Sequence, residues 1–451
     1  MELKEKKVLV AGFGKTGIAC TDFLLQRGAR VVVNDNKERS GFDNNTIKRY
    51  EEKGIEFVFG NHPGKLFLDV DIILISPGID PRNLPHEEIR KKGIPVISEI
   101  ELAYQFAEGK IIGVTGTNGK TTVTTLLGEL FKKAGYATAV CGNIGFPFIT
   151  AVNDQSSYDY FIVEISSFQL EAVHTFRAHG GIVLNISPDH MDRYAAQEDY
   201  VRAKWKIFLK QCENDWAIVN AMQADCWKKM PSIHSRILEF SSKGSVTQGC
   251  FLKEGMIYYT DGSVPIPVMT TDMIRLKGMH NVENVMVCII AAQQEHLDKE
   301  IVYEVISTFK GLPHRMEVVS EINGRIFIND SKATNPDAVV KALEGFKRNV
   351  IIILGGKDKE LDYSDLKESI QNHVKIAMLI GETKHKIYEA VKGTAVKILF
   401  PDTLEEAVKT AYSLSEPGDV VLLSPACASF DMFKDYVDRG NTFKRIVAGL
   451  V

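Results

Sequence analysis

The chain lacks the features typical of exported, membrane-spanning or nucleic-acid-binding proteins. Its seven cysteines are an odd number with no Cys-x-x-Cys spacing, so neither a disulfide framework nor a thiolate metal site is expected, and a reducing compartment is favoured. No apolar run approaches the roughly 20 residues needed to cross a bilayer, which argues against export and membrane insertion. The 54 basic and 58 acidic residues give a formal net charge of -4 without a basic run, so nucleic acid is not an expected partner. We therefore expect a cytoplasmic protein.

What the chain does have is a repeated pattern of short apolar runs, Gly-rich or polar turns and helical periodicity. This pattern is typical of α/β folds with mostly parallel sheets. A length of 451 residues suggests about three domains of roughly 150 residues each. We predict three, over residues 1–98, 99–307 and 308–451. Strands are expected at residues 8–11, 31–33, 72–75, 96–97, 110–115, 160–164, 181–186, 325–329, 349–354, 376–380 and 420–423, with a small antiparallel addition within 216–273.

A glycine-rich turn follows the first predicted strand. Gly12, Gly14 and Gly17, with Asp35 at the end of the next strand, form a match to the dinucleotide-binding fingerprint. Glycines at a helix N-terminus let a backbone approach any nucleotide diphosphate, so the pattern does not single out NAD. The alternative is that the glycines only allow tight packing of the strand against the helix.

A second glycine-rich loop, Gly116-Thr117-Asn118-Gly119-Lys120-Thr121-Thr122, lies between a predicted strand and an amphipathic helix. Its backbone amides would cradle phosphates, Lys120 would bridge the outer phosphates, and the Thr121 hydroxyl would bind magnesium. Val114 stands where the usual P-loop has its first glycine, so the loop is a variant. It predicts ATP binding.

Three residues after this loop could form the metal site that it requires. Glu164 and His190 follow predicted strands, at the edge where ligands bind in open α/β sheets. Their oxygen and nitrogen donors suit Mg²⁺ or Mn²⁺ better than zinc. Lys204 lies at the border of an apolar helical stripe, where it could extend to solvent or, if desolvated, react with carbon dioxide to give a carbamate.

Three strands of the third predicted sheet are followed by loops that contain lysine and hydroxyl side chains. Asp330 to Asn335, Gly355 to Asp358 and Ser424 to Phe430 bring lysines and hydroxyls to neighbouring strand ends, which would suit an anion such as a carboxylate. Solvated loops are the alternative. Arg315, just after the second predicted boundary, could either reach the ATP phosphates when domains close or form an ordinary interdomain salt bridge.

Taken together, these segments resemble the Mur ligase family of peptidoglycan synthesis, and the resemblance covers all three predicted domains. The Gly-Thr-Asn-Gly-Lys-Thr loop is common to the family and its folate-polyglutamate relatives. The more discriminating stretches are residues 166–171, 189–194, 329–335 and 424–429, and the Asp-Asn-Pro-Arg signature of the diamino-acid-adding members is absent. The resemblance implies three domains, namely an N-terminal Rossmann-like, a central P-loop ATPase-like and a C-terminal Rossmann-like domain.

The resemblance also implies roles for individual residues. The UDP end of UDP-N-acetylmuramoyl-L-alanine is expected at Lys15, Thr16, Asp35, Asn36, Ser76 and Gly78, with its sugar part near Asn143 and His190. ATP is expected at Gly116, Thr117, Asn118, Gly119, Lys120, Thr121, Thr122, Asn281, Asn284, Arg315 and Asp330. D-Glutamate is expected at Thr334, Lys357, Ser429, Phe430 and Tyr436. The metal, Mg²⁺ or Mn²⁺, is expected at Thr121, Glu164, His190 and Lys204, the last as a carbamate, and the catalytic set is Lys120, Glu164, His190 and Lys204.

The reaction implied by the resemblance is ATP-dependent amide formation. A substrate carboxylate attacks the γ-phosphate of ATP, and the amine of D-glutamate then attacks the resulting acyl phosphate. Closure of the domains would exclude water, and a monomer is expected. Two other hypotheses remain: an NAD-dependent oxidoreductase with a regulatory ATP site, and a nucleotide-binding protein without catalysis.

Overall fold

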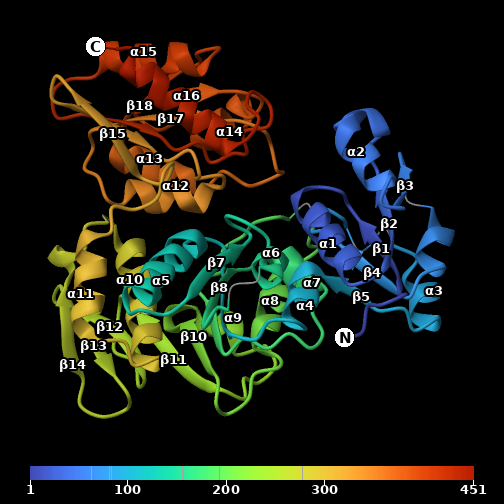
Figure 1. The fold of residues 1–451 in the computed structure, drawn as a ribbon. Coiled ribbons are helices and arrows are strands. Elements are labelled where there is room, and N and C mark those ends of the chain that lie inside the picture. The colour runs from blue at the N-terminus through green and yellow to red at the C-terminus, as the bar shows by residue number, and fades with distance from the viewer. Residues whose placement is uncertain are drawn as a thin grey trace.

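The fold, seen in a computed structural model, has three lobes, each built around its own sheet (Figure 1). The structure describes residues 1–61, 63–80, 82, 84–154, 157–191, 193–276 and 278–450. We name the lobes by the predicted boundaries: N-terminal (1–98), central (99–307) and C-terminal (308–451). Within the described part of the chain, none of the helices has the length and apolar character needed to span a membrane.

The N-terminal lobe contains a five-stranded parallel sheet in the order β3-β2-β1-β4-β5. The four strands predicted here are present, and β3, which was not predicted, adds an edge. The strands are β1 (Lys7–Ala11), β2 (Arg30–Asp35), β3 (Glu56–Phe59), β4 (Ile72–Ile75) and β5 (Val96–Ser98), and the helices are α1 (Lys15–Gln26), α2 (Asn44–Glu51) and α3 (His86–Lys91).

The turn between β1 and α1 explains the glycines of the first motif. A Cβ on Gly17 would lie 1.9 Å from the carbonyl oxygen of Gly12, so only glycine lets the helix start this close to the strand. Gly14 is different, because a Cβ there would meet nothing within 4 Å. Tight packing therefore accounts for Gly17, whereas Gly14 leaves the backbone open to a ligand.

The central lobe contains a nine-stranded sheet in the order β14-β13-β12-β11-β10-β9-β6-β8-β7. Its strands are β6 (Lys110–Thr115), β7 (Thr138–Gly142), β8 (Tyr160–Glu164), β9 (Gly180–Val183), β10 (Trp216–Asn220), β11 (Arg236–Ser241), β12 (Gly249–Lys253), β13 (Met256–Thr260) and β14 (Ile266–Thr270). Its helices are α4 (Glu99–Tyr104), α5 (Lys120–Lys133), α6 (Phe148–Asn153), α7 (Ser167–Glu171), α8 (Gln197–Trp205), α9 (Ala224–Trp227), α10 (Met279–Gln294) and α11 (Lys299–Thr308).

The antiparallel addition predicted within residues 216–273 is confirmed, but it begins later than expected. β10 and β11 continue the parallel sheet, and only β12, β13 and β14 pair antiparallel. The turns of the two hairpins lie at Glu254-Gly255 and Asp261-Gly262. The addition extends the central sheet at the edge far from β7.

The C-terminal lobe contains a six-stranded sheet in the order β15-β16-β20-β17-β18-β19, parallel except for β15. Its strands are β15 (Glu317–Ile322), β16 (Arg325–Asn329), β17 (Val350–Gly355), β18 (Val374–Ile380), β19 (Lys397–Leu399) and β20 (Val420–Leu423). Its helices are α12 (Pro336–Leu343), α13 (Leu366–His373), α14 (Lys384–Val391), α15 (Leu404–Leu414) and α16 (Tyr436–Ala448). Because β16, β20 and β17 are neighbours, the three loops singled out in the sequence end at one edge of the sheet.

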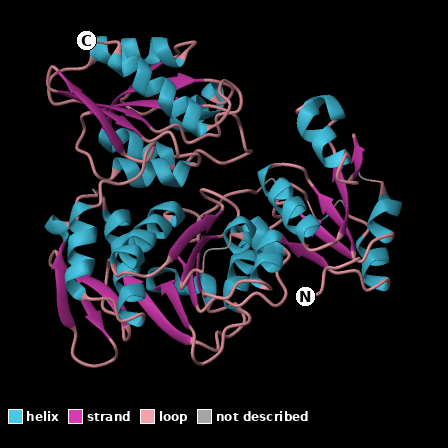
Figure 2. Cartoon of the chain, viewed as in Figure 1, coloured by secondary structure: helices cyan, strands magenta, loops and turns pink. Residues whose placement is uncertain are grey.

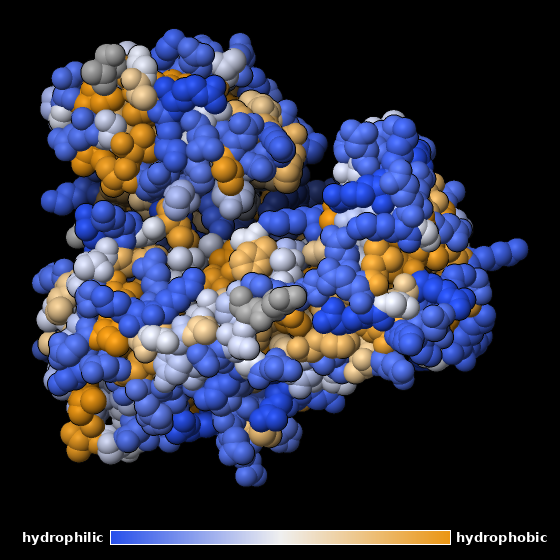
Figure 3. Space-filling model, in the orientation of Figure 1, coloured by the Kyte–Doolittle hydropathy of each residue, from blue (hydrophilic) through white to orange (hydrophobic). Residues whose placement is uncertain are grey.

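The N-terminal and central lobes share a hydrophobic core, whereas the C-terminal lobe has cores of its own. One cluster of buried side chains runs from the N-terminal lobe into the central lobe, joining Val8 and Phe23 of the first to Phe148 and Phe161 of the second. α1 and α4 both pack against α6 at this junction. The C-terminal lobe has its own clusters on the two faces of its sheet. Helices flank each sheet (Figure 2), and the surface is notched between the C-terminal lobe, at the upper left, and the N-terminal lobe, at the right (Figure 3).

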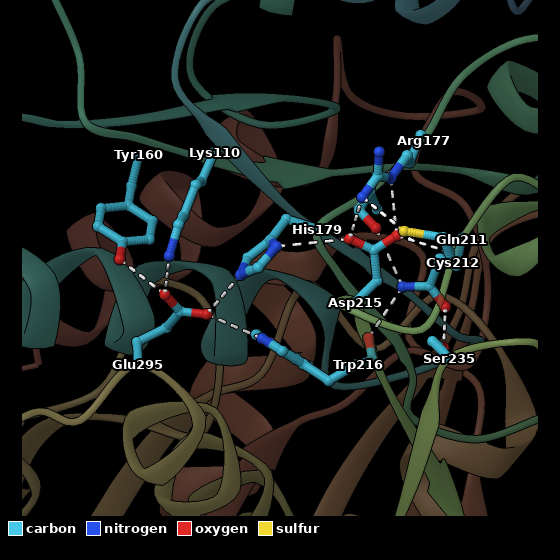
Figure 4. A network of polar contacts seen from close by, with 11 residues as sticks. Lys110, Tyr160, Arg177, His179, Gln211, Cys212, Asp215, Trp216, Ser235 and Glu295 are labelled. Atoms are coloured by element: carbon cyan, nitrogen blue, oxygen red, sulfur yellow. Dashed lines mark hydrogen bonds and ion pairs between the residues drawn. The ribbon is translucent and has the colours of Figure 1, made fainter.

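A polar network lies at the amino ends of the central strands, where β6, β8 and β10 begin (Figure 4). The carboxylate of Glu295, just after α10, accepts hydrogen bonds from Lys110 Nζ (2.8 Å), Tyr160 OH (2.7 Å), His179 Nε2 (2.9 Å) and Trp216 Nε1 (2.8 Å). The network ties α10 to the starts of the parallel strands. The network occupies the amino ends of these strands, which leaves their carboxyl ends open to ligands.

Candidate active site

A cavity of about 750 Å³ lies where the three lobes meet. All three sheets contribute to its wall through the loops that follow their strands: Lys15 and Pro77 come from the first, Lys120 and Glu164 from the second, and Lys332 from the third. Ligands bind at such carboxyl edges in open α/β sheets.

The P-loop occupies the centre of the cavity wall. It follows β6, and Gly119, with φ of +87°, forms the cap at which α5 begins. A Cβ on Gly119 would lie 2.5 Å from Asn284 Oδ1, so glycine is required both by the backbone and by this neighbour. Asn185, after β9, fixes the loop by accepting from Asn118 N (2.8 Å) and donating to Asn118 O (3.0 Å). The helix expected after the loop is α5, and its apolar residues Val123, Leu126, Leu127, Leu130 and Phe131 are all buried.

Two lysines share one carbonyl of this loop. Lys120 Nζ donates to Gly116 O (2.9 Å) and Thr117 O (2.8 Å), and Lys204 Nζ donates to Gly116 O (2.8 Å). Lys204 is only 2% exposed, so the idea that it extends to solvent is wrong. Burial, reinforced by the charge of Lys120, holds the pKa of Lys204 well below its ordinary value. An amine with a lowered pKa is more often neutral and therefore more nucleophilic.

The Glu164 carboxylate lines the cavity with only one of its two oxygens hydrogen-bonded among the described residues. Its Oε1 accepts from Asn143 Nδ2 (2.8 Å), but its buried Oε2 has no hydrogen-bond partner among the described residues. An orphaned buried carboxylate oxygen is costly unless a ligand satisfies it. The described residues contain no cluster of three His, Cys, Asp or Glu side chains that could hold a metal. A magnesium ion here would therefore also need the Thr121 hydroxyl, a modified Lys204 or phosphate oxygens, a donor set that suits this ion.

His190 lies across the cavity in an unusual backbone conformation. Its φ is +56°, in the left-handed region, and its imidazole packs edge-on against Phe168 with ring centres 4.7 Å apart. Its Nε2 lies 3.6 Å from a carboxylate oxygen of Asp189. Non-glycine residues with such backbones are concentrated at functional sites.

Arg315 lies between two residues that have the same unusual backbone conformation. Its neighbours His314 (φ +63°) and Met316 (φ +46°) both have left-handed backbones, and its guanidinium lines the cavity. The carboxylate of Asp330, after β16, faces it and accepts from Ser424 Oγ (2.8 Å). Burial raises the pKa of Asp330 to about 6. Arg315 thus lines the same cavity as the P-loop residue Lys120.

The C-terminal lobe touches the P-loop through side chains of opposite charge. Lys332 Nζ donates to Thr121 Oγ1, the hydroxyl expected to bind magnesium. Asp337, in the first turn of α12, accepts from Asn118 Nδ2 (2.5 Å) and from Ser187 Oγ (2.9 Å) of the central lobe. These contacts place a cation and a carboxylate of the C-terminal lobe against the P-loop of the central lobe.

Of the residues expected to bind the UDP end, only some line the cavity: Lys15, Thr16, Asn143 and His190. Asp35 is buried, and it accepts from Phe13 N (2.8 Å) and Lys37 N (3.0 Å), while Ser76 Oγ donates to Gly12 O (3.1 Å). Both thereby shape the first glycine loop. Asn36 and Gly78 also lie outside the cavity wall, although Pro77 belongs to it.

The remaining expected residues divide in the same way. Those lining the cavity are Thr117, Asn118, Gly119, Asn284, Thr334, Ser429, Phe430 and Tyr436, in addition to Lys120, Thr121, Glu164, Lys204, Arg315 and Asp330. Gly116, Thr122 and Asn281 lie behind the wall. Lys357 also lies outside it, because its Nζ is paired with Glu382 at 2.7 Å.

The sequence analysis did not assign several residues that the structure brings to the site. Lys359 lines the cavity and lies 4.0 Å from Asp189, itself a lining residue. Asn185 fixes the P-loop and Asp337 bridges the lobes. The sequence could have indicated these residues, because each follows a strand or one of the polar loops already singled out. Asp192, in the marked stretch 189–194, lies outside the described residues.

The charge of the cavity suits anionic ligands. Among the described residues, seven lysine or arginine side chains line it, against three carboxylates, those of Glu164, Asp189 and Asp330. Burial lowers the pKa of Lys332 to about 8, although the charge of Glu164 opposes this shift. Burial also lowers the pKa of Lys120, against the charges of Glu164 and Asp189. An excess of buried cations is stabilised when phosphates or carboxylates enter.

Comparison with known sequences gives matches to three domains in order. Residues 6–98 match the Mur ligase MurD-like N-terminal domain, residues 114–292 the Mur ligase middle domain, and residues 314–427 the Mur ligase glutamate ligase domain. Relatives named UDP-N-acetylmuramoylalanine–D-glutamate ligase include one from Koribacter versatilis, 43% identical, with 99% of this chain and 98% of the relative covered. Another, from Alkaliphilus oremlandii, is 40% identical with both chains fully covered.

Solved structures with the same fold are more distant in sequence. A pseudomurein peptide ligase type C from Methanothermus fervidus has a TM-score of 0.61 and 18% identity, with 99% of this chain and 100% of that chain covered. A UDP-N-acetylmuramate-alanine ligase from Thermotoga maritima has a TM-score of 0.60 and 18% identity, over 99% and 100% of the two chains. At 18% identity, these similarities show that the fold is shared and nothing more.

Proposed function

The chain belongs to the Mur ligase family, and from this membership we propose how its cavity catalyses ligation. It is an ATP-dependent ligase of peptidoglycan synthesis that joins D-glutamate to UDP-N-acetylmuramoyl-L-alanine, as do the relatives that cover its whole length. The observation that carries the mechanism is the single cavity to which all three sheets contribute. Three ligands have to meet for this reaction, and the cavity offers one lobe for each.

ATP is proposed to bind the P-loop, with Lys120 and Arg315 on its phosphates. Both side chains line the cavity, and Asn284 and Asp330 lie beside them. Mg²⁺ or Mn²⁺ would be held by Thr121, Glu164, His190 and Lys204, and the orphaned Oε2 of Glu164 supports this assignment. The ion would supply positive charge against the crowded phosphate oxygens. Lys332 would have to leave Thr121 for the ion to bind there.

Lys204 is proposed to act as a carbamate. After Nζ loses its ammonium proton to solvent, the neutral amine would attack carbon dioxide, forming an N–C bond and releasing a second proton. An anion would then stand where a buried cation stood. Burial at 2% exposure favours the neutral amine that this step needs. The anion would also relieve repulsion from the neighbouring Lys120.

The other two ligands are proposed to enter from opposite ends of the cavity. The sugar-linked acid would lie along Lys15, Thr16 and Asn143, with its diphosphate near Gly14 and its uridine near Asp35, Asn36, Ser76 and Gly78. D-Glutamate would lie by Thr334, Ser429, Phe430 and Tyr436, and Lys357 would have to leave Glu382 to reach it. The carboxylate of the sugar-linked acid would then lie between the ATP phosphates and the amine of D-glutamate.

The proposed reaction has two steps. The carboxylate oxygen of the sugar-linked acid attacks the γ-phosphorus, the bond to ADP breaks, and Lys120 and Arg315 stabilise the charge on the transferring phosphoryl group. The D-glutamate nitrogen then attacks the acyl phosphate carbonyl, and the tetrahedral intermediate expels phosphate to leave the amide. Closure of the C-terminal lobe over the cavity would keep water from the acyl phosphate.

The proposal is tested by an assay of ADP and phosphate release. Release is expected only with ATP, a divalent metal, UDP-N-acetylmuramoyl-L-alanine and D-glutamate together, and a panel of amino acids should favour D-glutamate. Release of ADP without the sugar nucleotide would contradict it. We further propose that the enzyme acts as a monomer in the cytoplasm, because one chain supplies all the groups named above; sedimentation at assay concentration would test the monomer.

A further inference from the structure

The turn that presents His190 is anchored from behind by one glutamate. The His190 carbonyl accepts from Arg193 N (3.0 Å) and Tyr194 N (3.1 Å), which closes the turn. Glu171, the last residue of α7, accepts from Arg193 Nη2 (2.5 Å) and Tyr194 OH (2.6 Å). The left-handed backbone of His190 is thus held by two bonds within the turn and two to Glu171.

The Arg193 side chain also reaches into another lobe. Its Nη1 donates to the carbonyl oxygen of Pro77 (2.9 Å), in the loop after β4 of the N-terminal lobe. Its guanidinium lies over the ring of Phe168 at 4.1 Å, and the same ring contacts the His190 imidazole. One planar group therefore contacts the loop expected to hold the UDP-linked acid and supports the ring beneath His190.

The arrangement is costly to maintain, which argues that it has a function. The Arg193 side chain is 11% exposed and that of Glu171 16%, so both charges are largely removed from water. Arg193 Nε is buried without a hydrogen-bond partner among the described residues. A lysine could not replace this fork, because one ammonium cannot bond Glu171 and Pro77 in the same plane while stacking on Phe168.

Arg193 does not itself line the cavity, whereas Pro77, Phe168 and His190 all do. We propose that Arg193 is a positioning residue, which sets the Pro77 loop of the N-terminal lobe in register with His190 and so presents the carboxylate of the sugar-linked acid to ATP. This inference rests on the proposed function. A small misplacement of reacting groups costs much in rate, so the effect should be seen in catalysis and in binding of the sugar nucleotide.

The test compares Arg193→Met and Arg193→Lys with Arg177→Met. Arg177 is a matched control, because it pairs with Asp215 (2.7 Å) at the opposite edge of the central sheet. For Arg193→Met we expect the Kd of UDP-N-acetylmuramoyl-L-alanine, measured by calorimetry without ATP, to rise about tenfold. We expect kcat to fall on the order of 100-fold. The Kd of ATP should stay within about twofold, and Arg193→Lys should fall between the wild type and Arg193→Met.

The outcomes separate the inference from the proposed function. Wild type and Arg177→Met must both release ADP in a manner that depends on the two substrates; if neither does, the proposed function fails. If both do, and the Arg193 variants match Arg177→Met in kcat and in sugar-nucleotide Kd, the positioning role is wrong. An equal loss of ATP and sugar-nucleotide binding would also overturn it, because that is a general structural effect. Should Arg193→Met not fold, the conservative Arg193→Lys variant decides the question by the same criteria.

Discussion

At the scale of single residues, Glu164 gives the sharpest test of the metal site. Glu164→Gln keeps the Oε1 bond to Asn143 but removes the negative charge from the orphaned Oε2. We expect affinity for Mn²⁺, measured by electron paramagnetic resonance with ADP present, to fall by more than the roughly 10–100-fold typical of indirect metal partners. Activity should fall in parallel. Glu304→Gln, at an exposed ion pair with Lys133, serves as the control; unchanged Mn²⁺ affinity in Glu164→Gln would remove Glu164 from the site.

Glu99 predicts a pH dependence of stability that is unrelated to catalysis. Its side chain is buried at the start of α4, where Oε1 accepts from Ile149 N (2.6 Å), and burial raises its pKa from the ordinary 4.5 to about 7. The folded protein therefore holds this proton more tightly than the unfolded chain does. The stability this provides is complete below about pH 4.5 and is lost as the pH rises through about 7.

Glu99→Gln should remove this contribution. Between pH 5 and 7 the free energy of unfolding of the wild type should fall relative to the variant, at most by about 1.4 kcal/mol per pH unit. Urea unfolding at pH 5, 6, 7 and 8 measures it, with Glu405→Gln on the surface as the control. Parallel curves for the wild type and Glu99→Gln would contradict the assigned ionisation.

Residue positions were predictable from the sequence only where a local motif determined them. The P-loop, Glu164 and His190 were found because strand ends and glycine spacing are visible in one segment. Glu99, Arg193 and Asp337 depend on partners far away along the chain, such as Ile149, Pro77 and Asn118. The burial of Lys204 was left open because helical spacing placed it at the border of the apolar stripe, and the neighbouring loop that covers it was not in view.

At the scale of elements, the Glu295 network is expected to hold the central sheet together without affecting its ligands (Figure 4). Burial opposes ionisation of this carboxyl, but donors from His179, Lys110, Trp216 and Tyr160 outweigh it and hold the pKa below its ordinary value. Glu295→Gln should lower the free energy of unfolding by about 2–3 kcal/mol at pH 7. The difference should shrink as the pH falls below about 4.5, because the unfolded wild type then takes up a proton that the folded protein does not bind.

Denaturant unfolding at pH 7 and pH 4 checks this prediction. Nucleotide affinity should be unchanged, since the network lies where the strands begin and the cavity lies where they end. Lys133→Met, which breaks only the exposed pair with Glu304, is the control and should cost less than about 1 kcal/mol. A loss of nucleotide affinity in Glu295→Gln would show that the two edges of the sheet are coupled.

Most strands could be predicted because each parallel strand is a short apolar run followed by a turn. The strands outside residues 216–273 that were not predicted are β3, β7, β15 and β19, and each is an edge strand of its sheet. β3 is a half-buried edge strand, so its sequence is not uniformly apolar. β15 joins antiparallel at an edge and is largely accessible, with Val318 66% exposed. The order of strands within each sheet did not follow from the sequence, because it depends on which faces pack together.

At the scale of the whole molecule, Asp337 predicts how firmly the C-terminal lobe rests on the P-loop. Asp337→Ala removes the acceptor for Asn118 and Ser187 and leaves Lys341 unpaired. Hydrogen bonds to charged groups contribute about 1.5–3 kcal/mol each, so the balance between contacting and separated lobes should shift at least about tenfold. Small-angle X-ray scattering should record a larger radius of gyration. Asp362→Ala, in a local turn of the same lobe with Ser364, should leave the radius unchanged, and equal radii for both variants would exclude the contact in solution.

The hydrophobic cluster shared by Phe23 and Phe161 has a consequence for how the protein is made. The inner side of the first sheet is completed only by central-lobe residues, which extend to Val219. Ribosomes add roughly 5–20 residues per second, so that side waits on the order of 10 s for its covering after the first hundred residues emerge. The nascent N-terminal lobe is therefore the part of the chain that most needs shielding by chaperones, whereas the C-terminal lobe, made last, can fold without waiting for any other segment.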